Sequence, residues 1–479
     1  MHSVMSIQSL LPAALMSLAA CASARAQGGS PEAKQFVTTD APVIALTHVR
    51  VIDGTGAPSV PNQTVLIERG IIRAVGDSAR VAIPAGTQVL DLTGRSVLPG
   101  LVMMHEHMFY PSGRGSIYNE QGFSFPRLYL AGGVTTARTG GNMAGYADLE
   151  LKRAIDEGRA VGPALDVTAP YLNGPGLPIY QVHALTGAAD AREMVAHWAD
   201  RGATSFKAYM QIRRAELRSA VKEAHRRGLK VTGHLCSITF REAAAIGIDN
   251  LEHGLVVASD FVKDKKPDAC PAGGVTPSIA ALDVSGAPVQ ALIRELVARK
   301  VAVTSTLTVF ETFTPGRPLA PIGALDAMLP EARDQYTRRH AAIAAQADSP
   351  WAALFPKEMQ FERDYFRAGG LLLAGTDPTG YGGVVAGYSN HRELELLVEA
   401  GLTPLEAIKV GTLNGAQYLG RAARIGSIAL GKRADLMIVR GDPSVRIADI
   451  TQVETVFKDG VGYDSAQLFA SVKGTVGLH

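Results

Sequence analysis

Apolar runs alternate with helical patterns through the middle of the chain, from residue 98 to residue 423. Short runs rich in branched apolar residues predict strands, at 96–105, 133–139, 164–169, 204–209, 229–234, 250–254, 301–309 and 371–377. Apolar residues at three-to-four spacing predict helices, at 147–158, 190–202, 214–228, 237–247, 287–300 and 390–401. Strands that alternate with helices predict a parallel sheet, and eight such strands predict a TIM-like (β/α)8 barrel.

Both ends of the chain carry short strand patterns without long helices. Residues 41–97 contain several such runs, and residues 424–479 contain more, with a hairpin turn at Asp459-Gly460. We therefore expect one small composite β-sandwich built from the two ends, because chain termini commonly meet in compact folds. Residues 27–40 are polar, and they are predicted to form a linker.

The first 26 residues resemble an export signal. Leu10–Ala20 form an apolar core, and Ala24-Arg25-Ala26 offers a cleavage site, although no Lys or Arg precedes the core. Export to a bacterial periplasm follows, with two alternatives: secretion, or a lipoprotein anchored through Cys21. No apolar run of 18 residues occurs later, so we expect no transmembrane segment.

The charge and the cysteine content exclude some partners and one source of stability. The net charge is only +2, with no basic run, so nucleic acid is not an expected partner. After signal removal only Cys236 and Cys270 remain, which cannot build a disulfide framework. Cys236 is expected to be a small buried apolar residue, and stability is expected to come from the core.

Side chains suited to metal binding stand at the ends of five predicted strands. His105 and His107 are two residues apart, so both point to the same side of their strand. Each histidine taken singly is more often structural than ligating. The whole set, arranged at strand ends, predicts two divalent cations around one activated water. The candidate ligands are His105, His107, Lys207, His234, His253 and Asp377.

Lys207 is the sharpest of these signals. It lies among Phe206, Ala208 and Tyr209 on a strand expected to be covered on both faces. Burial favours the neutral, nucleophilic amine, which can add CO2 and become a carbamate that bridges two cations. A salt-bridged or snorkelling lysine is the alternative.

Asp377 is placed to contact a metal and the attacking water together. It can act as a general base and then protonate the leaving group, although a turn-forming aspartate is the alternative. The formal charges of the site sum to +1: two divalent cations contribute +4, and the carbamate, Asp377 and a bridging hydroxide contribute –1 each. This positive charge leaves Lewis-acid capacity to polarise a substrate carbonyl. Imidazole and oxygen ligands suit zinc best.

With these motifs the chain resembles the amidohydrolase superfamily. The resemblance spans about residues 43–475 and includes PGLVMMHEH, GVTTART, FKAY, TGH, LEHG and GTD. It implies a TIM-like barrel with a composite β-sandwich. It also assigns His105, His107 and Asp377 to one metal, His234 and His253 to a second, and carboxylated Lys207 to the bridge. The context is most similar to the imidazolonepropionase-related branch, with its two-metal prolidase-like members.

Three further residues are candidate substrate contacts. Tyr209 could hydrogen-bond the scissile carbonyl, or pack in the barrel. His183 could contact substrate, or lie in solvent. Arg138 could neutralise a substrate carboxylate, or form a structural ion pair. The stretches 256–276 and 313–355 are expected to be long loops that shape a pocket or an oligomer contact.

The expected activity is hydrolysis of a small-molecule amide, of peptide or N-acyl amino acid type. A metal-bridged hydroxide attacks the carbonyl, with Asp377 as general base and acid and Tyr209 assisting. The alternatives are a cyclic amide hydrolase of hydantoinase type, an ester or lactone hydrolase, and a catalytically silent scaffold. We also expect a homo-oligomer.

Overall fold

The computed structural model describes residues 30–112, 117–177, 179 and 181–477. The predicted signal peptide, its cleavage site and Cys21 lie outside the described residues. No helix in the described part of the chain is both long and apolar enough to cross a membrane.

All eight predicted central strands form, and each pairs in parallel with its neighbours. They divide into a three-stranded sheet and a five-stranded sheet. The first contains β7 (Leu101–Glu106), β10 (Val134–Thr139) and β11 (Ala164–Asp166). The second contains β12 (Ser205–Ala208), β13 (Lys230–Gly233), β14 (Asn250–Glu252), β15 (Ala302–Ser305) and β16 (Leu372–Ala374). Buried apolar side chains fill these strands, as a sheet covered on both faces requires.

Backbone hydrogen bonds connect the two sheets at both edges. The amide of Ala169 donates to the carbonyl of Ser205 at 3.0 Å, beyond the end of β11. The amide of Thr376 donates to the carbonyl of His105 at 3.1 Å, which joins the end of β16 to β7. The strand ladder itself is not continuous around all eight strands. The fold is therefore mixed α/β, and a single closed barrel stays a prediction.

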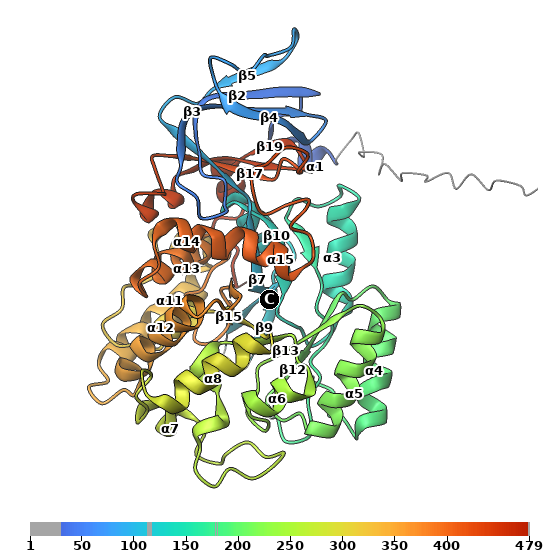
Figure 1. Ribbon diagram of the computed structural model, residues 1–479, viewed down its shortest axis with the longest axis vertical. Helices are drawn as coiled ribbons and strands as arrows, with labels where there is room; N and C mark the ends of the chain where they lie inside the picture. The colour runs from blue at the N-terminus through green and yellow to red at the C-terminus, as the bar shows by residue number, and fades with distance from the viewer. Residues whose placement is uncertain (1–29, 113–116, 178, 180, 478–479) are drawn as a thin grey trace, which may run out of the picture.

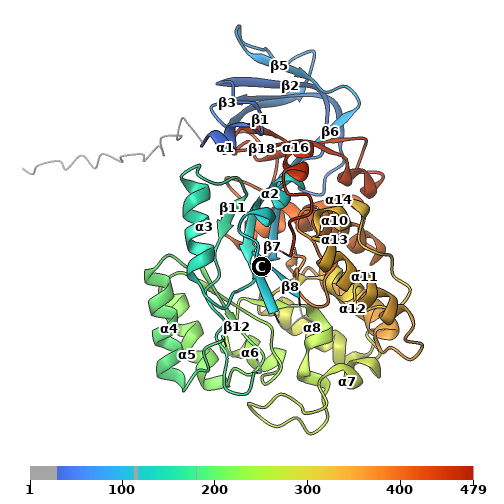
Figure 2. The ribbon, with the colours of Figure 1, turned by 180° about the vertical axis from the view of Figure 1, so that it is seen from behind.

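Helices surround the strands on the outside (Figures 1 and 2). The predicted helices form as α3 (Tyr146–Asp156), α4 (Ala188–Asp200), α5 (Arg214–Arg226), α6 (Phe240–Ile246), α8 (Ala287–Ala298) and α13 (Tyr388–Glu399). The sequence patterns did not indicate α2 (Ser124–Ala131), α7 (Thr276–Ala280), α14 (Pro404–Lys409), α15 (Gly415–Tyr418) or α16 (Ser465–Ala470).

Two predictions about the later chain were wrong. The stretch 313–355 is not a long loop, because α10 (Ile322–Ala327), α11 (Pro330–Ala344) and the start of α12 (Trp351–Arg367) occupy it. Only Tyr336 and Ile343 of α11 are buried, so this helix shows little apolar periodicity. The strand predicted over 301–309 ends at Ser305, and a short helix, α9 (Leu307–Glu311), follows it.

Both ends of the chain join in one nine-stranded sheet above the central strands (Figure 1). Its strands are β1 (Val37–Thr39), β2 (Val43–Val51), β3 (Val60–Glu68), β4 (Ile71–Asp77), β5 (Gln88–Asp91), β6 (Arg95–Pro99), β17 (Leu436–Arg440), β18 (Val453–Lys458) and β19 (Val461–Asp464). Antiparallel pairing of β6 with β17 joins the N-terminal and C-terminal strands. The predicted linker was wrong in part, because residues 27–40 include α1 (Pro31–Lys34) and β1.

The sequence analysis did not predict a contact between the two remaining cysteines. Cys236 and Cys270 form a disulfide, with their Cα atoms 4.9 Å apart. Cys236 is buried, as expected, but it ties the segment after β13 to the long segment after β14. Sequence spacing alone could not reveal this contact, because two cysteines 34 residues apart can meet only through the fold.

Candidate metal centre

The six predicted ligands meet at the carboxyl ends of the central strands. His105 lies near the end of β7, with His107 just beyond it, and Lys207 lies on β12. The other three, His234, His253 and Asp377, directly follow or closely follow β13, β14 and β16. Parallel strands present their carboxyl ends at one edge, which is where α/β folds place their sites.

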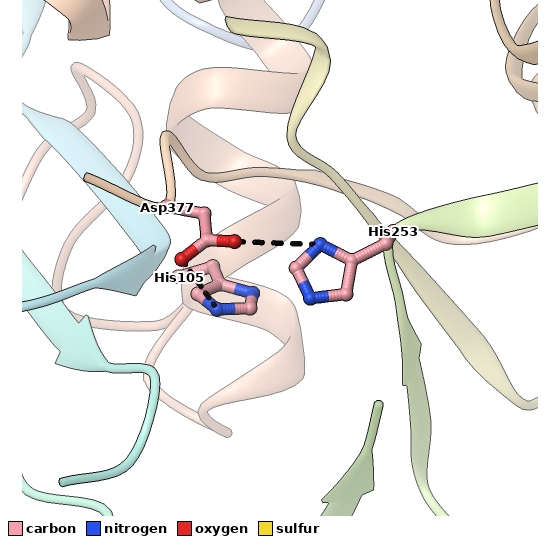
Figure 3. Close-up of side chains that lie close together, drawn as sticks. All are labelled: His105, His253 and Asp377. Carbon is pink, nitrogen blue, oxygen red and sulfur yellow. Dashed lines mark ion pairs between the residues drawn. The ribbon is translucent and has the colours of Figure 1, made fainter. Parts of the chain in front are cut away.

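Asp377 lies at the centre of this group. Its Oδ1 is 3.2 Å from His107 Nε2 and 3.6 Å from His105 Nε2. Its Oδ2 lies 3.8 Å from His253 Nδ1. Figure 3 shows one oxygen of this carboxylate directed at His105 and the other at His253, and one donor atom of each residue lies within 4.8 Å of the others.

Lys207 and His234 complete the cluster. Lys207 Nζ is 2.9 Å from His105 Nε2, on the side of that ring that faces Asp377. The ring of His234 lies 4.5 Å from the ring of His253, measured between centroids. All six side chains that the sequence singled out therefore share one cluster.

Two of the ligand positions have an unusual backbone conformation. His253 has φ of 68° and Asp377 has φ of 49°, in the left-handed region. This conformation is unfavourable for residues with a side chain, and it persists where the surroundings enforce it. At both positions it turns the chain sharply after the strand, so that the side chain reaches the shared cluster.

The donor set fits divalent cations. His253 Nε2 is buried and has no hydrogen-bond partner among the described residues, while its Nδ1 contacts Thr306 Oγ1 at 2.8 Å. A buried nitrogen without a partner is costly, and a bound cation would satisfy it. His107 Nδ1 is 2.9 Å from the carbonyl of Gly141, the kind of contact that orients a ligating imidazole.

Burial favours the protonation states that ligate metals. It lowers the pKa of His107 to about 4 and that of His234 to about 3, so both imidazoles are neutral at pH 7. Burial lowers the pKa of Lys207 to about 8, only partly offset by Glu252 and Asp377. Burial alone would raise the pKa of Asp377, but the neighbouring histidines hold it well below its usual range.

Comparison with known proteins supports the same interpretation. The sequence profile of the Amidohydrolase family matches residues 357–462. The imidazolonepropionase of Geobacillus sp. strain WCH70 is 26% identical over 399 residues, which cover 79% of this chain and 84% of that protein. A proposed prolidase from Bifidobacterium longum has a similar structure, with a TM-score of 0.64 and 25% identity over 90% of this chain and 98% of that one. Together these similarities support the amidohydrolase superfamily that the motifs predicted.

Within the superfamily the similarities are to imidazolonepropionase- and prolidase-like proteins. A solved Xaa-Pro dipeptidase shares its fold, with a TM-score of 0.65 and 20% identity over 88% of this chain and all of that one (100%). These similarities support amide hydrolysis in general.

A buried ion pair lies beside the first candidate ligand, His105. Glu252, the residue before His253, contacts His105 Nδ1 at 2.8 Å and accepts a hydrogen bond from Thr232. It also accepts a 2.5 Å hydrogen bond from Arg138 Nη2. The sequence analysis overlooked Glu252, although its position in LEHG, directly before a candidate ligand, was a usable signal.

The role suggested for Arg138 as a substrate contact was wrong. Its side chain is 0% exposed and lies behind the ligands, with Nε donating to the carbonyl of Met104 at 2.7 Å. The strand that carries Arg138 points it away from the mouth, toward Glu252. The structural ion pair, the alternative weighed for it, is what forms.

Replacing Arg138 by methionine should destabilise the fold by about 3–5 kcal/mol, because Glu252 would remain as an uncompensated buried charge. Chemical denaturation measures the change. Arg153→Met is the matched control, since Arg153 forms an exposed ion pair with Glu150 and should matter little. Equal effects of the two substitutions would contradict the assignment of Arg138 to the buried pair.

Most of the candidate ligands line a pocket whose other walls are largely aromatic. Its lining includes Tyr209, Tyr171, Phe109, Tyr118 and Met143 beside the ligand side chains. Tyr209 packs against Tyr171, with ring centroids 4.5 Å apart, and its ring lies 5.1 Å from that of His234. Tyr209 therefore lies beside the candidate ligands, and its contact with a substrate stays a prediction.

His183 lies in a second, outer hollow. It contacts Asp190 at 2.9 Å, and its side chain is about half exposed. Met143 lines both this hollow and the pocket over the ligands, and Trp198 and Met194 form apolar parts of the outer hollow. His183 therefore lies away from the candidate ligands. Its contact with a distant part of a substrate stays a prediction.

Proposed function

We propose that the protein is a two-metal hydrolase of linear amides, of peptide or N-acyl amino acid type. The observation that carries the proposal is the cluster of four histidines and Lys207 around Asp377, together with the buried His253 Nε2 that has no hydrogen-bond partner among the described residues. Family membership supports amide hydrolysis in general, and the donor set favours zinc.

The donors divide between two cations. His105, His107 and Asp377 would hold one, and His234 and His253 the other. Lys207 would bridge them as a carbamate, formed when its neutral amine adds CO2 and releases a proton. Its burial and lowered pKa support this, as does the lack of a carboxylate ion pair to its Nζ among the described residues. When bound, the cations would polarise the substrate carbonyl and lower the pKa of water.

The chain itself moves the proton and orients the substrate. Asp377 is ionised, so one of its carboxylate oxygens can accept the proton of the attacking water and deliver it to the departing amine. Burial raises the pKa of Tyr209 well above its usual value, so its hydroxyl stays protonated and can donate to the substrate carbonyl oxygen. Glu252 holds His105 in place.

Two further features support finer parts of the proposal. The outer hollow beyond Met143 gives the distant end of a linear substrate room next to the ligand pocket. The Cys236–Cys270 disulfide is consistent with the proposed export, because disulfides persist in oxidising compartments such as the periplasm.

A substrate panel tests the proposal. Zinc-loaded protein should hydrolyse dipeptides or N-acyl amino acids faster than cyclic amides, lactones or esters of similar size. Preference for cyclic amides would favour the hydantoinase-type alternative. Failure of fully metal-loaded protein to hydrolyse any compound of the panel would contradict the proposal.

A further inference from the structure

Three buried glutamates lie behind the candidate metal centre without a counter-ion. Glu358 and Glu362 are one turn apart on α12, and Glu393 lies on α13. All three are 0% exposed. No lysine, arginine or histidine of the described residues forms an ion pair with any of them, whereas Glu395 and Glu399 of α13 both pair with Arg392. Three buried carboxylates cannot all stay ionised in such surroundings.

Ser305 identifies where one proton must be. Its Oγ lies 2.6 Å from Glu362 Oε2 and 2.5 Å from Glu393 Oε1. A hydroxyl has a single proton, so it can donate to only one of these carboxyls. The second of the two short contacts must therefore be a hydrogen bond in which a protonated glutamate donates to the oxygen of Ser305. At least one of the two glutamates is therefore a neutral acid.

The remaining contacts distinguish the two glutamates. Glu393 also accepts hydrogen bonds from the amides of Leu307, at 3.3 Å, and Thr308, at 3.0 Å. Three donors to one carboxyl favour its ionised form. Glu362 has only the contact with Ser305, and its Oε1 has no hydrogen-bond partner among the described residues. Glu362 is therefore the neutral acid, donating to Ser305, which donates to Glu393.

The pKa shifts of the buried carboxyls agree with a neutral Glu362 that donates through Ser305 to Glu393. Burial raises the pKa of Glu362 well above its usual range, and the facing carboxyls of Glu358 and Glu393 raise it further. Burial raises the pKa of Glu358 to about 8, and that of Glu393 to about 7 despite its donors. Glu106 on β7 is the other titratable group near Glu393, and burial raises its pKa to about 8.

The segment that Glu393 holds contacts one candidate ligand directly and the residues just before another. Thr306 Oγ1 lies 2.8 Å from His253 Nδ1. Thr308 Oγ1 donates to the carbonyl of Thr376, the residue before Asp377, at 2.9 Å. The amide of Gly375 donates to the carbonyl of Ser305 at 3.0 Å. Residues 305–308 thus connect the buried glutamates to both left-handed ligand turns.

We propose that the chain Glu362–Ser305–Glu393, with Glu362 as a protonated acid, positions His253 and Asp377 for the reaction. Its effect on turnover rests on the proposed function. The protonation of Glu362 and the geometry of the segment do not, so they can be tested even if no substrate is found. Glu362 and Glu393 are positioning residues, because neither touches the site itself.

Two nearly isosteric substitutions separate the glutamates. In Glu362→Gln the amide can still donate to Ser305, so kcat/KM should stay within about threefold of wild type. In Glu393→Gln the acceptor of three donors loses its charge, and kcat/KM should fall about 10–100-fold, as when an outer partner of a ligand is lost. A loss in Glu362→Gln as large as that in Glu393→Gln would overturn the proposal.

Infrared difference spectra at neutral pH give a readout that does not depend on activity. Subtracting Glu362→Gln from wild type should reveal one protonated carboxylic acid band, and no such band would contradict the proposal. A cation bound at the glutamates, seen as one more ion per wild-type chain than per Glu362→Gln chain, would overturn it as well. Failure of the proposed function alone would leave the band unchanged.

The pH dependence of stability has a definite sign. Because the pKa of Glu362 is raised in the folded state, its stabilising effect is present at acidic pH and is lost as the pH rises toward the folded value. Between the ordinary glutamate pKa of 4.5 and the raised folded value, melting temperatures of wild type should therefore fall with rising pH relative to those of Glu362→Gln. Parallel decline of the two proteins would contradict the assignment of the proton.

Discussion

Replacing Lys207 by methionine should lower kcat/KM by more than about 100-fold, which exceeds the usual effect of losing an outer partner of a metal ligand. Methionine keeps an unbranched apolar stem in this buried position but has no amine, so it cannot form the carbamate. The cluster would lose the group proposed to join the two cations. Steady-state kinetics on the best substrate of the panel, with saturating zinc, measures the effect.

The control for this substitution is Lys152→Met. Lys152 lies on α3 and forms a partly exposed ion pair with Asp156, remote from the ligand cluster in sequence and contacts. Its replacement should leave turnover unchanged. Near-normal activity of metal-replete Lys207→Met would rule out the carbamate, and the buried lysine would then have only a structural role.

Replacing Asp377 by asparagine should reduce kcat by about 10²–10⁴-fold, the usual contribution of a positioned general acid–base group. The two side chains have nearly the same shape, so the left-handed turn at this position should survive, and asparagine tolerates that conformation well. The amide, however, cannot accept the proton of water and pass it to the departing amine.

Asp156→Asn is the matched control, because Asp156 is a half-exposed aspartate on α3. Near-ultraviolet circular dichroism should show the same tertiary packing in both variants and in wild type. A kcat for Asp377→Asn within threefold of wild type, with the native fold retained, would contradict the role of Asp377 as the proton carrier.

The sequence was sufficient to predict the central strands and the six candidate ligands. Each ligand follows an apolar run, and parallel strands bring such positions to one edge whatever the details of the packing. His105 and His107 also gave a local signal, since residues two apart on a strand point the same way. These inferences needed only periodicity and side-chain chemistry.

The supporting residues depend on contacts that no local pattern encodes. Glu252 on β14 meets His105 on β7 and Arg138 on β10 only where the two parallel sheets come together, so the sequence could not show that Arg138 would form this ion pair. Ser305 likewise contacts Glu362 of α12 and Glu393 of α13, two residues that lie far from it in the sequence. The helix α11 was missed because little of its surface is buried, which leaves almost no apolar stripe to detect.

The metal content of the protein tests the central claim most directly. Purified wild-type protein, loaded with zinc and freed of unbound ions, should contain about two zinc ions per chain by elemental analysis, as the two donor sets require. Chelation should abolish amide hydrolysis, and added zinc should restore it. Lys207→Met should retain fewer ions under the same treatment. Fewer than one tightly bound cation per wild-type chain, or full activity after their removal, would contradict the two-metal account.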